Sequence, residues 1–145
     1  MSEIKLLNGD CLELMKNILD KSVDMILCDL PYGTTKNKWD VVINFENLWQ
    51  QYNQIITDNG VICLWGQEPF ASELRLSNLK MYRYDWIIEK NNATGFLNSK
   101  RMPLKAHEKV CVFYKNFLFI IHNLLKGSLI NIIELILAIT MANNK

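Results

Sequence analysis

Two short apolar runs, at residues 23–28 and 61–65, are the features that most constrain the fold of this chain. Each run is continuous rather than alternating, which is typical of a strand buried on both faces of a parallel sheet. Between them, residues 45–56 carry apolar side chains at helical spacing, and Gly60 is expected to end that helix. A strand–helix–strand unit of this kind predicts an α/β domain with parallel strands.

The flanking segments continue the alternation of strands and helices. Asp10 opens a short helix with the capping-box spacing Asp10-x-x-Glu13. Pro69 suits the first position of a further helix that runs to about Leu79. The remaining strands are expected at residues 3–8, 84–89 and 109–114. Because no helical pattern separates the last two strands, we expect them to pair antiparallel.

The composition fits one globular domain and excludes a broadly basic nucleic-acid binder. The chain has 145 residues, of which 50% are hydrophobic and 21% charged, with a net charge of +1. A local basic patch remains compatible with that charge. No cysteine pair has C-x-x-C spacing and no signal peptide is recognisable, so we expect reduced core cysteines in a cytoplasmic protein. The cysteines are Cys11, Cys28, Cys63 and Cys111.

The carboxyl-terminal segment differs in composition from the rest of the chain. Residues 117–139 are almost wholly apolar and long enough to span a membrane. Lys126 and Glu134 lie within them and are costly in lipid, so we favour a helix packed on the sheet over a membrane span. A third interpretation is that the tail is not the native continuation of the domain. We therefore divide the chain into residues 1–116 and an apolar, helical tail, 117–145.

The run at 23–28 leads directly into a short polar motif, Asp29-Leu30-Pro31-Tyr32. In an open parallel sheet, ligands bind beyond the carboxyl ends of the strands. Pro31 restricts Leu30 to an extended shape, which can turn the Leu30 carbonyl out as a free acceptor. Asp29 adds a second acceptor and Tyr32 a flat face, which together suit a planar ligand with an amino group, such as a nucleobase. The alternative is an aspartate that caps a turn and a tyrosine packed on the core.

Three segments resemble the amino-methylating DNA methyltransferases. "DLPYG" resembles their D-P-P-Y motif, with Leu30 where the commonest form has proline. "LLNGDCLELM" is similar to the first strand and turn of the subgroup in which that motif lies near the amino terminus. "YDWIIEKNNATGFLNSKRMPLKAHEKVCVFYK" resembles a later segment, with its W-x-x-x-K and its H-E pair. The resemblance covers residues 3–115.

The resemblance implies a fold, a reaction and a cofactor. The fold would be part of a Rossmann-like, doubly wound, mostly parallel sheet of the S-adenosylmethionine-dependent methyltransferase type. The reaction would move a methyl group from S-adenosylmethionine to the amino group of a flipped adenine, or less often cytosine, in double-stranded DNA. Asp29 and the Leu30 carbonyl would accept from that amine, and Tyr32 would stack on the base. The family occurs in phage and in restriction–modification systems.

The resemblance also assigns a cofactor role to Asp29 and to Asp10, whose counterpart in the family lies near the cofactor. The capping-box spacing at Asp10 gives an equally weighted and compatible interpretation as a helix cap. No metal site is expected, and we interpret His107 and Glu108 as structural. Two basic groups either contact DNA phosphates or form a solvated face. They comprise Lys36 and Lys38 beside the motif, and Lys100, Arg101 and Lys105 further along.

One motif of the family is missing from the sequence. The glycine-rich F-x-G-x-G turn that holds the methionine part of the cofactor is absent, since none of the six glycines forms G-x-G. We therefore expect a chain truncated or frameshifted near residue 116. The alternative function is a non-catalytic remnant that binds DNA or a partner. The sequence indicates neither the recognition site nor the oligomeric state.

Overall fold

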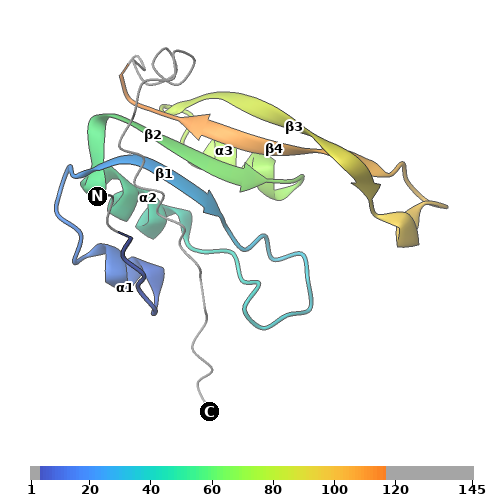
Figure 1. Ribbon diagram of the computed structural model, residues 1–145, viewed down its shortest axis with the longest axis horizontal. Coiled ribbons are helices and arrows are strands. Elements are labelled where there is room, and N and C mark those ends of the chain that lie inside the picture. Colours follow the sequence, from blue (N-terminus) through green and yellow to red (C-terminus); the bar gives the residue numbers. More distant parts are fainter. Residues whose placement is uncertain (1–3, 117–145) are drawn as a thin grey trace.

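The computed structural model describes residues 4–116, which form one mixed sheet with helices packed against it (Figure 1). The tail predicted at 117–145, and the boundary before it, lie outside the described residues. In chain order the elements are α1 (Cys11–Met15), β1 (Val23–Asp29), α2 (Phe45–Ile55), β2 (Ile56–Gly66), α3 (Phe70–Ser77), β3 (Tyr82–Thr94), the 3-10 helix η1 (Phe96–Asn98) and β4 (Lys105–Phe113).

The strands are ordered β1-β2-β4-β3 in the sheet. β1 pairs parallel with β2, with Asp29 opposite Trp65. β4 runs antiparallel to both β2 and β3, so β1, β2 and β3 all point the same way. The predicted parallel pair and the predicted antiparallel pair are both confirmed. The carboxyl ends of β1, β2 and β3 consequently meet at one edge of the sheet.

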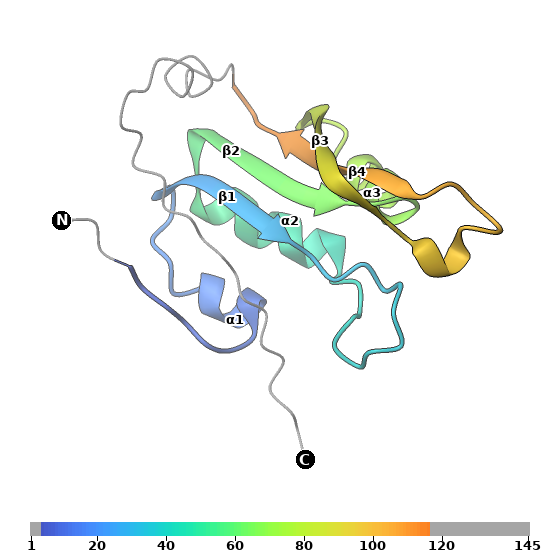
Figure 2. The same ribbon diagram turned by 45° about the vertical axis from the view of Figure 1, so that its right-hand side comes forward.

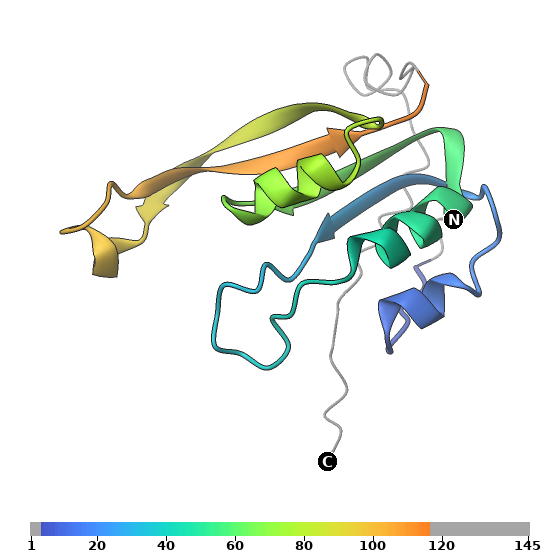
Figure 3. The same cartoon turned by 180° about the vertical axis from the view of Figure 1, so that it is seen from behind.

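The main core lies between the sheet and the helices, which cover one face in the described part of the chain (Figure 3). α2 is capped by Asn44, whose side chain accepts from the Asn47 amide. The helix turns Leu48, Tyr52 and Ile55 toward the sheet, where each is fully buried. On the other face of the sheet, strand side chains form a smaller cluster. Its buried members are Val61, Cys63, Val110 and Val112.

The prediction of a strand at residues 3–8 is wrong for residues 4–8, which are the ones that the structure describes. Residues 4–8 form no strand, and Ile4 and Leu6 are among the most exposed apolar side chains. Strand propensity reflects packing against neighbouring strands and burial, and neither is present here. The helix that follows is also shorter than its apolar spacing indicated and ends at Met15.

The predicted end of the second helix is also wrong. α2 ends at Ile55, and β2 begins at Ile56, so Gly60 lies within a strand. A Cβ added to Gly60 would lie 2.7 Å from Ile56 Cδ1 and 3.0 Å from the Asp24 carbonyl oxygen. Glycine is therefore needed at position 60 for close packing rather than for ending a helix. Pro69 precedes α3 as its N-cap instead of being its first residue.

β3 and β4 continue beyond the end of β2 as a two-stranded arm. The last pair between β2 and β4 is Gly66 with Lys109, whereas β3 and β4 remain paired as far as Thr94 and Lys105. We call residues 88–108 the arm. In Figures 1 and 2 the arm and the loop after β1 project from the same edge of the sheet.

Between residues 4 and 116, no helix has both the length and the hydropathy needed to cross a membrane.

Candidate functional site

A pocket of about 260 Å³ lies at the carboxyl end of β1. All of its lining comes from the strand end and the loop that follows. The lining residues are Asp29, Leu30, Pro31, Tyr32, Thr34, Thr35, Trp39 and Asp40. The structure therefore brings the four predicted motif residues together at the edge of the sheet where parallel α/β folds bind ligands.

Asp29 and Tyr32 are joined by a hydrogen bond. The Tyr32 hydroxyl donates to Asp29 Oδ1 over 2.6 Å. Burial of the ring, followed by this bond, raises the pKa of the Tyr32 hydroxyl, so it stays protonated and remains a donor. The bond occupies Oδ1, and no hydrogen bond to Oδ2 is found within residues 4–116. Asp29 thus keeps one carboxylate oxygen for a ligand.

The Tyr32 ring is held in place by an aromatic neighbour from another element. It stacks on Phe70, with ring centroids 4.9 Å apart and the planes inclined by 28°. Phe70 is buried at the start of α3 and also contacts Phe45 of α2. Two helices therefore fix the orientation of Tyr32, which is half-buried and lines the pocket.

Leu30 and Pro31 are both buried directly after the end of β1. Leu30 packs into the main core, which fixes the backbone at this position. Outside the regular elements, no hydrogen bond reaches the Leu30 carbonyl within the described residues. Leu30 is also one of the residues that line the pocket, and its carbonyl as an acceptor for a ligand stays a prediction.

Asp40 closes the loop of the pocket, a role that the sequence interpretation missed. Its carboxylate accepts the backbone amides of Gly33 at 2.8 Å and Thr35 at 2.6 Å. These bonds hold the pKa of the Asp40 carboxyl below its usual value, and the bond from the Thr35 amide contributes most. Gly33 has a φ of 69°, a left-handed conformation that glycine adopts without strain. The loop is therefore shaped by its own residues before any ligand binds.

Trp39 is a second aromatic side chain in the pocket and was also missed. It is 51% exposed, although tryptophan is usually largely buried. A large aromatic residue in a polar loop next to the motif is the sequence signal that could have identified it. With Tyr32, it gives the pocket two aromatic residues.

Asp10 is the N-cap of α1, which confirms its interpretation as a helix cap. Its Oδ1 accepts the amides of Leu12 at 2.9 Å and Glu13 at 3.2 Å. Both bonds use the same oxygen, so Oδ2 is left for another donor. Asp10 does not line the pocket.

The predicted basic residues fall into two separate places. Lys36 and Lys38 are exposed in the pocket loop. Lys100 and Arg101 are exposed near the tip of the arm, while Lys105 at the start of β4 donates to Gln67 Oε1 over 2.7 Å. The two groups thus lie on two segments that leave the same edge of the sheet.

No metal centre is found within residues 4–116, where no cluster of three or more potential ligands occurs. Glu108 instead pairs with Lys90, and His107 is exposed. All four cysteines are buried and free, and burial raises the pKa of Cys28 and Cys63 to about 12. They are core thiols, as the sequence predicted.

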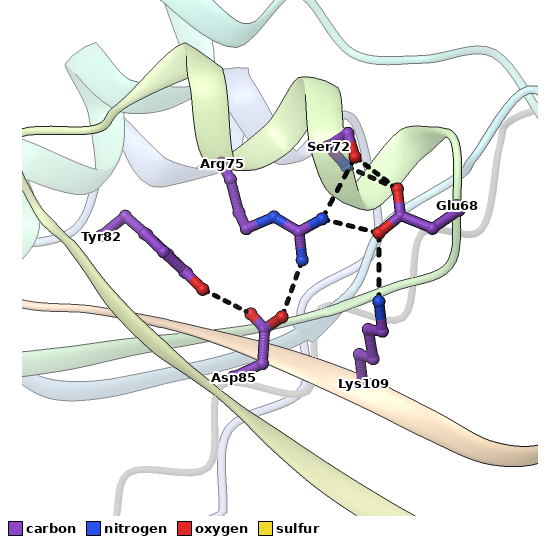
Figure 4. Close-up of polar contacts among 6 residues, drawn as sticks. All are labelled: Glu68, Ser72, Arg75, Tyr82, Asp85 and Lys109. Atoms are coloured by element: carbon purple, nitrogen blue, oxygen red, sulfur yellow. Dashed lines mark hydrogen bonds and ion pairs between the residues drawn. The ribbon is translucent and has the colours of Figure 1, made fainter.

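A network of charged side chains joins α3 to β3 and β4 (Figure 4). Arg75 is central: it donates to Asp85 Oδ2 at 2.7 Å and to Glu68 Oε1 at 2.6 Å. Glu68 also accepts from Ser72 and Lys109. Bonds from Ser72, Arg75 and Lys109 lower the pKa of Glu68 to about 2. This network fixes the start of α3, and hence Phe70, against the base of the arm.

Three solved structures align with most of this chain. M1.HpyAVI in complex with S-adenosylmethionine aligns with a TM-score of 0.60 and 19% identity, covering 81% of this chain and 56% of that chain. The cytosine-N4-specific PvuII DNA methyltransferase aligns with a TM-score of 0.59 and 13% identity, and the alignment covers 95% of this chain and 58% of that chain. A Thermus thermophilus protein complexed with S-adenosyl-L-methionine aligns with a TM-score of 0.54 and 13% identity, and the alignment covers 77% of this chain and 55% of that chain.

These likenesses define the fold. The chain has the mixed α/β fold of S-adenosylmethionine-dependent methyltransferases, and it spans a little over half the length of the structures it matches. No family model and no curated protein matches it.

Proposed function

We propose that the pocket after β1 binds a nucleobase of DNA and presents its exocyclic amine, adenine in the first instance, for methylation by S-adenosylmethionine. The observation that carries this proposal is the pairing of two acceptors with an aromatic face. Asp29 Oδ2 and the Leu30 carbonyl are the acceptors, and Tyr32 supplies the face. The fold supports it, because solved structures of this fold include a DNA methyltransferase and complexes with the cofactor.

The two acceptors would change the reactivity of the amine. An amine on a base is a poor nucleophile because its lone pair is delocalised into the ring. Hydrogen bonds from its two protons to Asp29 and the Leu30 carbonyl favour a pyramidal nitrogen with a localised lone pair. The nitrogen would then be placed to accept the methyl group that S-adenosylmethionine supplies, with S-adenosylhomocysteine as the leaving group, and it would lose one proton to water. Catalysis of this kind rests on positioning and preorganised electrostatics.

Tyr32 and Trp39 would hold the base in the plane of the two acceptors. The Tyr32 ring already stacks on Phe70, so little conformational entropy is lost in orienting the ring when the base binds. Stacking of this kind contributes about 1–3 kcal/mol per base. The base reaches the pocket by flipping out of double-stranded DNA.

The residues that we propose for the cofactor are Asp29 and Asp10. When bound, S-adenosylmethionine supplies an electrophilic methyl group on sulfur. Asp10 suits a hydroxyl or amine donor because helix capping uses only Oδ1. For DNA, Lys36, Lys38, Lys100, Arg101 and Lys105 are the proposed phosphate contacts.

A second candidate function is a DNA-binding module without methyl transfer. The observation that favours it is the exposure of Lys36, Lys38, Lys100 and Arg101 on two segments that leave the same edge of the sheet. Both functions share the DNA partner and differ in the cofactor.

Transfer of radiolabelled methyl from S-adenosylmethionine to plasmid DNA tests the proposal. Asp29→Asn should lower the rate by about 100-fold or more, as the loss of one preorganised group does in other enzymes. Asp20→Asn is the matched control, because Asp20 is an exposed acid that lies before β1, away from the pocket. Binding of the cofactor is measured separately by calorimetry. If the wild-type chain neither transfers methyl groups nor binds the cofactor, the proposed methyl transfer is rejected and the DNA-binding module becomes the favoured function.

A further inference from the structure

The tip of the arm carries two apolar side chains that contribute nothing to the core. Phe96 is 78% exposed and Leu97 is 98% exposed, both on the 3-10 helix η1. The pair is adjacent in the chain and lies at the end of a projecting hairpin (Figure 2). Both side chains are therefore accessible to a partner at the end of the arm.

The residues around this tip are cationic. The arm contains Lys90, Lys100, Arg101 and Lys105, and its two acids, Glu89 and Glu108, lie at its base rather than at its tip. Lys90 is paired with Glu108, and Lys105 is bonded to Gln67. Among residues 4–116, neither Lys100 nor Arg101 takes part in a salt bridge. The apolar tip is therefore followed within five residues by two cations directed to solvent.

The arm base is fixed relative to the pocket. Asp85 of β3 and Lys109 of β4 are held by Arg75 and Glu68, which lie in and just before α3 (Figure 4). Arg75 and Asp85 side chains are only 19% and 16% exposed. Because α3 begins at Phe70, which stacks on Tyr32, one set of contacts joins the pocket to the base of the arm.

We propose that the arm is a DNA-inserting element. Phe96 and Leu97 enter the duplex between bases, and Lys100 and Arg101 hold the neighbouring phosphates. This inference rests on the proposed function, in which a base leaves the stack and a gap must be filled. An apolar wedge bordered by cations is the combination with which proteins unstack base steps.

The charge around the tip favours DNA over a protein partner. Two exposed cations next to an apolar pair match a phosphate backbone beside a stack of bases. The competing occupant, a second copy of this chain, would place like charges together in a symmetric contact. Self-association through the tip is therefore a separate outcome of the test.

The test measures binding of the full chain to a 20-base-pair duplex, intact or with one abasic site, by fluorescence anisotropy. The double variant Phe96→Ser with Leu97→Ser should bind the intact duplex about tenfold more weakly. The wild type should prefer the abasic duplex, because the gap is already open, and the double variant should lose that preference. Leu19→Ser is the matched control, since Leu19 is 78% exposed outside the arm. Thermal unfolding should be the same for all three.

The cations are tested by the dependence of affinity on salt. Lys100→Ala with Arg101→Ala should reduce the slope of log affinity against log salt by about 2, while the preference for the abasic duplex is retained. Unchanged affinity and preference in the Phe96/Leu97 variant would overturn the inference. Loss of a dimer in that variant, seen by light scattering, would also overturn it and assign the tip to a protein contact.

The two proposals fail in different ways. If the wild type transfers methyl groups but the tip variant binds DNA normally, insertion is wrong and the proposed function stands. If binding depends on the tip but no methyl transfer occurs, insertion stands and the enzymatic proposal is wrong. If the wild type binds no duplex at about 50 mM salt, where electrostatic attraction to DNA is strong, both are wrong.

Discussion

The pocket and the arm lie at the same edge of the sheet, but their side chains differ in how they are held. In the pocket, side chains bond to one another: Asp40 holds the loop amides, and Tyr32 lies between Asp29 and Phe70. At the arm tip, Leu97, Lys100 and Arg101 point to solvent. The difference teaches that the pocket side chains are held by the protein itself, whereas no salt bridge within residues 4–116 holds Lys100 or Arg101 at the tip.

The largest effect is expected from breaking the contact that joins the two regions. Arg75→Ala leaves Asp85 partly buried without its cation, which should lower the free energy of unfolding by about 3 kcal/mol. Urea denaturation measures this loss. The double variant Arg75→Ala with Asp85→Ala should recover part of it, because the unpaired carboxylate is also removed. Equal losses in the single and double variants would contradict a coupled pair.

The next effect distinguishes ligand binding from folding in the pocket. Trp39→Ala should weaken binding of duplex DNA by about tenfold, because one stacking surface is lost. The midpoint of thermal unfolding should hardly change, since Trp39 is half exposed. Trp86→Leu, an exposed tryptophan outside the pocket lining, is the control. A large loss of stability in Trp39→Ala would show that the loop depends on this side chain for its shape.

A smaller effect tests whether stacking on Phe70 orients the Tyr32 ring. Phe70→Leu keeps an apolar side chain at the start of α3 but removes the aromatic stack on Tyr32, which should cost about 1 kcal/mol of stability. Methyl transfer should fall by more than this loss of stability explains, with kcat reduced and KM for DNA little changed. A change confined to KM would mean that Phe70 acts on binding alone.

The smallest effect is a dependence of stability on acid pH. The pKa of Glu68 is lowered to about 2 and that of Asp40 is also lowered, so both carboxylates bind protons less readily in the folded state. Their contribution is fully present above the ordinary carboxyl pKa, about 4.5, and is lost as pH falls toward 2. Thermal melts between pH 5 and about 2.5 measure it, and Glu68→Gln should flatten the decline.

The sequence predicted those parts of the molecule that depend on local pattern. The runs at 23–28 and 61–65 are neighbouring parallel strands, and the Asp29–Tyr32 motif lies at the end of the first. Gly60 was misinterpreted because a glycine that ends a helix and one that permits close packing look the same in sequence. Residues 4–8 have strand composition without a partner in the described chain.

The site was predicted only where it is continuous in sequence. Asp40, Trp39 and Phe70 complete the pocket and its support, but their roles come from contacts across loops and between elements. The bonds of Arg75 to Glu68 and Asp85 span 7 and 10 positions of the chain and link α3 to the loop before it and to β3, and no spacing rule relates these positions. Pairing across elements is decided by the tertiary fold, which a single sequence does not display.

The overhang of β3 and β4 beyond β2 has a consequence for the tip of the arm. Between its pairs with Ile88 and Thr94, β4 advances by the three steps from Glu108 to Lys105, at roughly 3.3 Å each, or about 10 Å in all. β3 uses six steps for the same length, and its additional residues form the register shift between Glu89 and Thr94. The Arg75–Asp85 contact thus holds the regular part of β3, and the tip residue Leu97 follows an irregular stretch of that strand.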